Sequence, residues 1–177
     1  MMRKLAVTIS LLLLVASSPP PIQEQKWTHF TSRDEMTGEV SAYATSPRTA
    51  PTRRMDFPYA DVRGWLAFGS NGKSEWAYIG FTEAPNLTNT SPQSGGYSTF
   101  SARVRWDDEM QYMRMTQEWG SRFLNFQSDK EAIEKMIAAN TVLVELRWYG
   151  SESVYFQFSL NGSASAIANA RAAVRDE

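Results

Sequence analysis

Residues 128–160, SDKEAIEKMIAANTVLVELRWYGSESVYFQFSL, decide the fold of this chain. Their first third predicts a helix over 129–140, because apolar residues recur at helical spacing at Ala132, Ile133, Met136 and Ile137. Ser128 and Glu131 have the spacing of a capping box, in which each side chain bonds the other residue's backbone N–H. The stretch therefore begins with a helix that has one apolar face to bury.

Strict alternation follows the predicted helix. The apolar positions of the two alternating segments are Val142, Val144, Leu146 and Trp148, then Val154, Phe156, Phe158 and Leu160. Gly150-Ser151 between them predicts a two-residue turn that joins antiparallel strands. One apolar and one polar face indicate a sheet covered on one side. We therefore predict an α+β fold: an antiparallel sheet, curved or sandwich-like, with two short helices in the C-terminal half, at 129–140 and 165–175.

The N-terminus has the layout of a secretory signal peptide. A short basic region, 1–4, precedes an apolar run from Leu5 to Val15, and small residues follow. The run is shorter than the about 20 residues that a membrane-spanning helix needs. We predict a signal peptide over 1–17 with cleavage after Ser17, a flexible lead over 18–26 and one β-rich domain over 27–177. The expected location is periplasmic or secreted, with a retained anchor as the alternative.

Composition excludes several classes of protein. The 177 residues include no Cys and one His, and the formal net charge is −1. Loss of residues 1–17 removes Arg3 and Lys4 and leaves a charge of −3. This mild acidity lacks the basic footprint of a nucleic-acid-binding protein. Without disulfides, the stability of the predicted exported domain has to come from its apolar core.

Catalytic and cofactor motifs are missing from the sequence. His29 is the only imidazole, no nucleophile elbow is present, and no His/Cys cluster has zinc spacing. The sequence GKS at 72–74 lacks the preceding Gly of a phosphate loop, because Ala67 stands there. The acidic clusters, Asp34-Glu35 and Asp107-Asp108-Glu109, fall in predicted turns. We therefore predict a protein that is not an enzyme, with no catalytic residue, metal, cofactor, nucleotide or nucleic acid.

Aromatic residues are the first candidates for binding. The chain has six Trp. Trp106 and Trp148 occupy apolar strand positions and are expected in the core. Trp76 and Tyr78 share one face of a predicted strand, 75–81, where an exposed aromatic pair can stack on a sugar or seat a partner's side chain.

Three arginines are the second candidates. Arg103 and Arg105 share one face of a predicted strand, and Arg147 is on the polar face of another. If the two strands are neighbours, these side chains form a cationic ledge for a carboxylate or for a partner's acidic residues. The alternative is a set of cross-strand ion pairs with Glu145, Glu109 or Glu118.

Several motifs together resemble a known group. They are the Trp27 strand, the turn DEMTG at 34–38, an aromatic hairpin ending near Phe81, a strand ending VRWD at 104–107, and FSLNG at 158–162 before an Ala-rich helix. This order resembles the VasI/TagO-type periplasmic proteins associated with bacterial type VI secretion, and related small exported phage or prophage proteins. Relatives usually carry Pro at the position of Glu35, and Cys is frequent in them. The resemblance implies an accessory role in the envelope and supplies no catalytic residue.

These observations lead to two expectations about function. The first is an exported, non-enzymatic envelope accessory or binding protein, secretion-associated or phage-encoded, with an envelope protein as partner. The alternative is a carbohydrate- or peptidoglycan-binding module with weak hydrolase activity, whose partner is a glycan. The candidate binding residues for either are Trp76, Tyr78, Arg103, Arg105 and Arg147.

Overall fold

The computed structural model describes residues 26–175. The predicted signal peptide, 1–17, and nearly all of the predicted lead lie outside the described residues. The strands are β1 (Thr28–Arg33), β2 (Val40–Thr45), β3 (Gly64–Ser70), β4 (Glu75–Phe81), β5 (Ser91–Gln93), β6 (Tyr97–Trp106), β7 (Glu109–Glu118), β8 (Phe123–Phe126), β9 (Thr141–Arg147) and β10 (Ser153–Ser159). The helices are α1 (Asp129–Ala138) and α2 (Ser163–Ala173).

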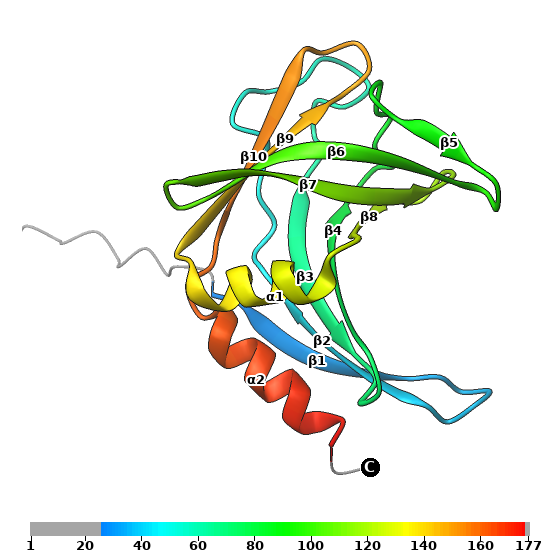
Figure 1. The fold of residues 1–177 in the computed structure, drawn as a ribbon, viewed down its shortest axis with the longest axis vertical. Helices are drawn as coiled ribbons and strands as arrows, with labels where there is room; N and C mark the ends of the chain where they lie inside the picture. The colour runs from blue at the N-terminus through cyan, green and yellow to red at the C-terminus, as the bar shows by residue number, and fades with distance from the viewer. Residues whose placement is uncertain (1–25, 176–177) are drawn as a thin grey trace, which may run out of the picture.

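All of these strands belong to one antiparallel sheet (Figure 1). Their order is β1-β2-β3-β4-β8-β7-β6-β9-β10, and the short β5 pairs with β6. Most neighbours in this order are successive hairpin strands, whereas β4 pairs with β8 and β6 pairs with β9 across long stretches of chain. The predicted α+β fold, an antiparallel sheet with two helices in the C-terminal half, is confirmed.

The sheet rolls over until β10 meets the chain that follows β2. Ser46 makes the bend possible, because its backbone N–H donates to the carbonyl of Leu66 over 2.8 Å and its hydroxyl accepts from the Leu66 N–H over 2.9 Å. The chain then leaves β3, and Pro51 pairs with Phe156 of β10. The segment after β2 thus connects the start of β3 to the edge strand β10.

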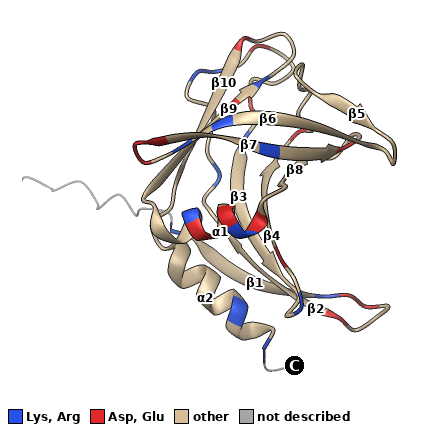
Figure 2. Cartoon of the chain, viewed as in Figure 1, with Lys and Arg blue, Asp and Glu red and all other residues tan. Residues whose placement is uncertain are grey.

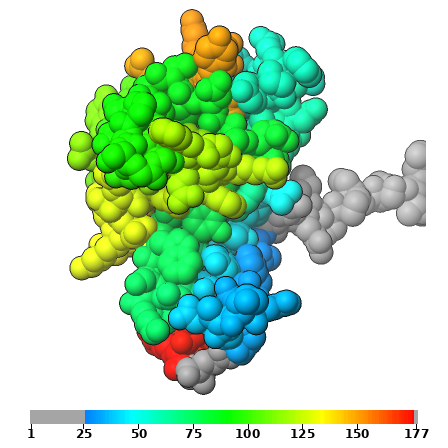
Figure 3. Space-filling view, turned by 90° about the vertical axis from the view of Figure 1, so that its right-hand side faces the viewer, coloured from blue at the N-terminus to red at the C-terminus, as the bar shows by residue number. Residues whose placement is uncertain are grey.

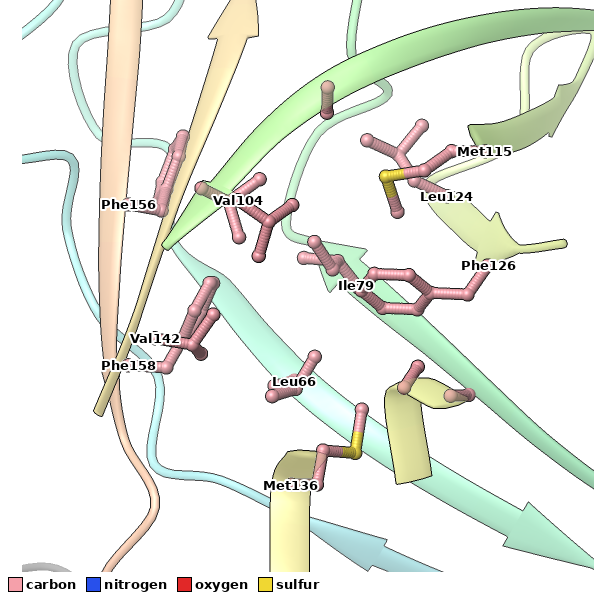
Figure 4. Close-up of a cluster of buried hydrophobic side chains, with 14 of the residues drawn as sticks. Leu66, Ile79, Val104, Met115, Leu124, Phe126, Met136, Val142, Phe156 and Phe158 are labelled. Carbon is pink, nitrogen blue, oxygen red and sulfur yellow. The ribbon is translucent and has the colours of Figure 1, made fainter. Parts of the chain in front are cut away.

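Buried side chains from eight elements meet inside the roll (Figure 4). Those labelled there are Leu66, Ile79, Val104, Met115, Leu124, Phe126, Met136, Val142, Phe156 and Phe158. Helix α1 contributes Met136, and α2 packs over the inner side of β1 and β2. Trp106 and Trp148 are buried, as predicted. The helices therefore cover the inner side of the sheet, and the outer side of β1–β4 faces away from them (Figure 1).

The start of α1 differs from the prediction. Ser128 is the N-cap residue, but its side chain makes no capping hydrogen bond, so the capping box is wrong. The next residue, Asp129, accepts a hydrogen bond of 2.8 Å from the backbone N–H of Ala77. Ala77 lies on β4 beyond the residues that pair with β8. Burial raises the pKa of the Asp129 carboxyl, and the bond from Ala77 opposes this shift. Asp129 thus ties the helix to a part of β4 that has β3 on one side and no strand partner on the other.

Three other local predictions are corrected. Arg147 pairs with Ser153, so a five-residue connection, 148–152, replaces the predicted two-residue turn. Its first residue, Trp148, is buried and forms a bridge with Leu87, which draws the connection away from a tight turn. β5 lies in the stretch 83–96, where polar residues, Pro and Gly predict a loop, and β8 lies in the stretch 119–126, whose sequence predicts only a connection. Both strands are short, so alternation alone did not reveal them.

Candidate functional site

A row of aromatic side chains crosses the outer side of four adjacent strands. The sheet register places Phe30 opposite Tyr43, Tyr43 opposite Gly69, and Gly69 opposite Trp76. Directly opposed residues of antiparallel strands share one face of the sheet. The rings of Phe30 and Tyr43 stack with centroids 5.2 Å apart, and Tyr43 meets Trp76 edge-on at 6.0 Å. The row therefore places three rings in contact on the outer face.

Gly69 leaves room for the Trp76 ring because it has no side chain. A Cβ atom built on Gly69 would lie only 2.3 Å from Cε2 of Trp76, so the indole covers this glycine closely. Trp65 covers Gly80 in the same way, with a corresponding distance of 2.4 Å. An indole that lies on the backbone has little freedom to rotate. Trp76 is thereby held as a fixed, half-buried platform before any ligand arrives.

A second row of side chains continues the aromatic surface toward β8. Tyr78 lies opposite Asn125, and its ring meets Phe123 at 5.3 Å with an interplanar angle of 88°. Burial raises the pKa of Tyr78 to about 12, and Tyr43 adds to the shift. The phenol therefore stays neutral at physiological pH and keeps its O–H as a hydrogen-bond donor.

These two rows form the walls of a groove of about 500 Å³ on the outer face, the aromatic groove. It is lined by Phe30, Ser32, Tyr43, Trp76, Tyr78, Glu118, Ser121, Phe123 and Asn125. Phe30 is 49% exposed and Phe123 is 43% exposed, so the two ends of the groove are open to water. In the space-filling view, the blue β1–β2 hairpin, the green part of the β3–β4 hairpin and the yellow-green segment around β8 lie on one side of the molecule (Figure 3).

The structure places both predicted aromatic candidates, Trp76 and Tyr78, in this groove. Their partners, Phe30, Tyr43 and Phe123, are residues that sequence reasoning missed. Alternation puts Phe30 and Tyr43 on definite faces of their own strands. The faces of separate strands are related only through the sheet register, which the sequence does not contain.

The three candidate arginines do not converge. Arg103 lies opposite Glu145 in the sheet and forms an ion pair with it, and this hydrogen bond raises the pKa of Arg103. Arg105 is exposed on the same face of β6, opposite Leu143. Arg147 lines a different hollow, beside the β9–β10 connection. β6 and β9 are neighbours, but no continuous cationic ledge results.

The acidic candidates have structural partners. Asp107, in the β6–β7 turn, accepts hydrogen bonds from the backbone N–H groups of Asn140 and Thr141 over 3.1 and 2.8 Å. These bonds lower the pKa of Asp107. Asp107 does not line the aromatic groove, and Asp34 likewise bonds the backbone of its own turn. Within residues 26–175 no three His, Cys, Asp or Glu side chains gather in a way that suits a metal ion.

None of the helices in the described part of the chain is both long and apolar enough to cross a membrane. Comparison of the chain with protein-family models, with curated proteins and with solved structures finds no match.

Proposed function

We propose that this protein is a non-enzymatic binding protein of the cell envelope whose aromatic groove holds a segment of a neutral polysaccharide. The observation that carries the proposal is the composition of the groove. Five aromatic rings and four hydrogen-bonding side chains line it, and none of the lining residues is aliphatic. The flat faces of sugar rings present C–H groups that pack on aromatic rings, and their edges present hydroxyls that need polar partners.

The charge of the groove favours a neutral ligand. Glu118 is the one ionisable acid among its lining residues, and no Lys or Arg lines it. An anionic chain would meet repulsion from Glu118 without any compensating cation. Neutral hydroxyls can donate to the carboxylate of Glu118 and to the amide oxygen of Asn125, whose side chains lie beside the rings.

The arrangement of carboxylates supports binding rather than hydrolysis. Most glycoside hydrolases need two carboxyl groups about 5–9.5 Å apart across the scissile bond. The aromatic groove offers Glu118 alone. Asp107 is engaged in holding the backbone of Asn140 and Thr141. Weak hydrolase activity is therefore not part of the proposal.

Electrophoresis through gels that contain a dissolved polysaccharide tests the proposal. We expect the purified protein to migrate more slowly in gels with at least one neutral polymer among dextran, galactomannan and hydroxyethyl cellulose. No retardation is expected with polygalacturonate. Phe123→Ala removes an end of the groove that is 43% exposed, and it should weaken binding by about fivefold, a loss near 1 kcal/mol. Migration that is unchanged in every neutral gel, or equal retardation by polygalacturonate, would overturn the proposal.

A second surface supports the accessory-protein candidate, in which the partner is an envelope protein. On the β6–β7 hairpin, Met110 is 55% exposed and Tyr112 is 70% exposed, beside Arg103 and Arg105. Apolar and arginine side chains together are typical of the centres of protein interfaces. The predicted periplasmic or secreted location and the resemblance of the sequence motifs to VasI/TagO-type proteins fit such a partner.

Crosslinking in intact cells, followed by mass spectrometry, tests this second candidate. We expect one specific envelope protein to be captured by the wild-type protein and lost when Arg103 and Arg105 are both replaced by Ala. The double variant must keep the wild-type unfolding midpoint for the comparison to count. Capture that persists in the folded double variant would exclude this hairpin as the docking surface.

A further inference from the structure

A large hollow is lined by residues of the loop after β2 and of the β9–β10 connection. The β9–β10 connection lies at the end of the rolled sheet that is away from the helices (Figure 1). The volume of the hollow is about 1010 Å³, and we call it the arginine hollow. One wall is the loop after β2, and the other is the β9–β10 connection with the start of β10. It is lined by Arg53, Arg54, Met55, Asp56, Thr88, Arg147, Gly150, Ser151, Glu152, Ser153, Val154 and Tyr155.

Backbone hydrogen bonds hold the walls of the hollow in place. The N–H of Thr52 donates to the carbonyl of Tyr155 over 2.8 Å, which fixes the chain just before Arg53. The N–H of Thr88 donates to the carbonyl of Arg147 over 2.9 Å. Met55 is buried in the core beneath the loop. The three arginines therefore project from backbone that is already tied down.

The guanidinium groups of the hollow have no acidic partner. Within residues 26–175, Arg53, Arg54 and Arg147 make no ion pair, although Asp56 and Glu152 line the same hollow. Two arginines elsewhere do form ion pairs, Arg103 with Glu145 and Arg171 with Glu75. Figure 2 shows basic segments on the loop beside β10. The hollow thus holds three guanidinium groups that form no ion pair within the described residues, beside two acids that offset part of their charge.

We propose that the arginine hollow binds the phosphate group of a sugar phosphate or of a similar phosphorylated polyol. Planar guanidinium groups bind phosphate oxygens in a two-pronged geometry. The three positive charges of these arginines exceed the charge of about −2 that a phosphate monoester carries. Asp56 and Glu152 repel a bare anion but accept hydrogen bonds from the hydroxyls of a sugar. The two kinds of side chain in one hollow therefore select an anion that carries hydroxyl groups. This site is separate from the aromatic groove and does not depend on the function proposed for it.

Calorimetric titration at low ionic strength tests the proposal with four probes. They are glucose 6-phosphate, glucose, inorganic phosphate, and vesicles of phosphatidylinositol in phosphatidylcholine. We expect glucose 6-phosphate to bind and glucose not to bind. If the natural phosphate is that of a membrane headgroup, the inositol lipid vesicles are expected to bind instead. Binding should weaken as salt rises, because the contacts are ionic and lie near the surface.

Two sets of variants identify the residues responsible. The double variant Arg53→Gln with Arg147→Gln should weaken binding by about tenfold or more, since it removes two charge-assisted contacts. Arg114→Gln, at an exposed arginine of β7 outside the hollow, is the matched control and should leave binding unchanged. Glu152→Gln should raise the affinity for inorganic phosphate, because it removes one repelling carboxylate.

The unfolding midpoint of each variant should match that of the wild type, because Arg53, Arg147 and Glu152 are exposed. Binding of neither phosphorylated probe would overturn the proposal. Equal loss in the Arg114→Gln control, or binding of glucose as strong as that of glucose 6-phosphate, would also overturn it. Retained binding of the aromatic groove's polysaccharide in the arginine double variant would show that the two sites are independent.

Discussion

Replacing Trp148 with Ala is expected to lower the free energy of unfolding by about 3–5 kcal/mol. The side chain is fully buried, and its ring meets Tyr59 at 5.4 Å, Phe81 at 5.6 Å and Phe156 at 6.2 Å. These contacts join the end of β9 to β4, to β10 and to the loop after β2. Its removal therefore leaves a cavity where three parts of the rolled sheet meet.

The loss of unfolding free energy in Trp148→Ala should come from lost packing and not from a lost hydrogen bond. Within the described residues the indole N–H of Trp148 has no acceptor, so Ala at this position leaves no acceptor unpaired. Urea unfolding followed by circular dichroism gives the measurement. Trp119→Ala is the control, because Trp119 is 68% exposed, and it should change stability by no more than about 0.5 kcal/mol. Similar losses in the two variants would contradict the structure of the core.

Replacing Trp76 with Ala is expected to remove most of the affinity for polysaccharide, a loss of about 2 kcal/mol or more. The indole is the fixed central platform of the aromatic groove, because Gly69 lets it lie on the backbone of β3. The unfolding free energy should fall by only about 1 kcal/mol, since the ring is already partly in water. Gel retardation and urea unfolding of the same preparations separate these two effects. Unfolding of Trp76→Ala would instead assign Trp76 to the core.

Trp65→Ala provides a matched control for the loss of an indole. Trp65 covers Gly80 as Trp76 covers Gly69, but it does not line the aromatic groove. We expect Trp65→Ala to keep the affinity for polysaccharide. Equal losses of affinity in Trp65→Ala and Trp76→Ala would show that binding does not depend on the indole inside the aromatic groove in particular.

Two glycine variants test the orientation of the platform while keeping the indole. Gly69→Ala places a Cβ where the Trp76 ring now lies, so the ring must move, and overpacking of this kind costs about 1–3 kcal/mol. The affinity should fall nearly as far as in Trp76→Ala. Gly80→Ala displaces Trp65 instead and should keep the affinity, although it costs similar stability. Full binding by Gly69→Ala would contradict a preformed platform.

Local pattern was enough to predict most of the elements. Alternation over Tyr97–Trp106 and over 142–160 predicted β6, β9 and β10, because a strand with one buried face needs an apolar residue at every second position. Helical spacing predicted α1 to within two residues of its end at Ala138. The four residues of β8 were too few to show a period, so that strand was missed although it is the link between β4 and β7.

The sequence by itself determined which residues of each strand lie together, and it therefore identified Trp76 and Tyr78 as an aromatic pair on one face. Only the tertiary structure decided what surrounds that pair. The register of β1, β2 and β8 brings Phe30, Tyr43 and Phe123 into the groove. The rolling of the sheet places Arg147 in the same hollow as Arg53 and Arg54. The physical reason is that alternation is a property of one strand, whereas register and closure depend on contacts between residues far apart in the chain.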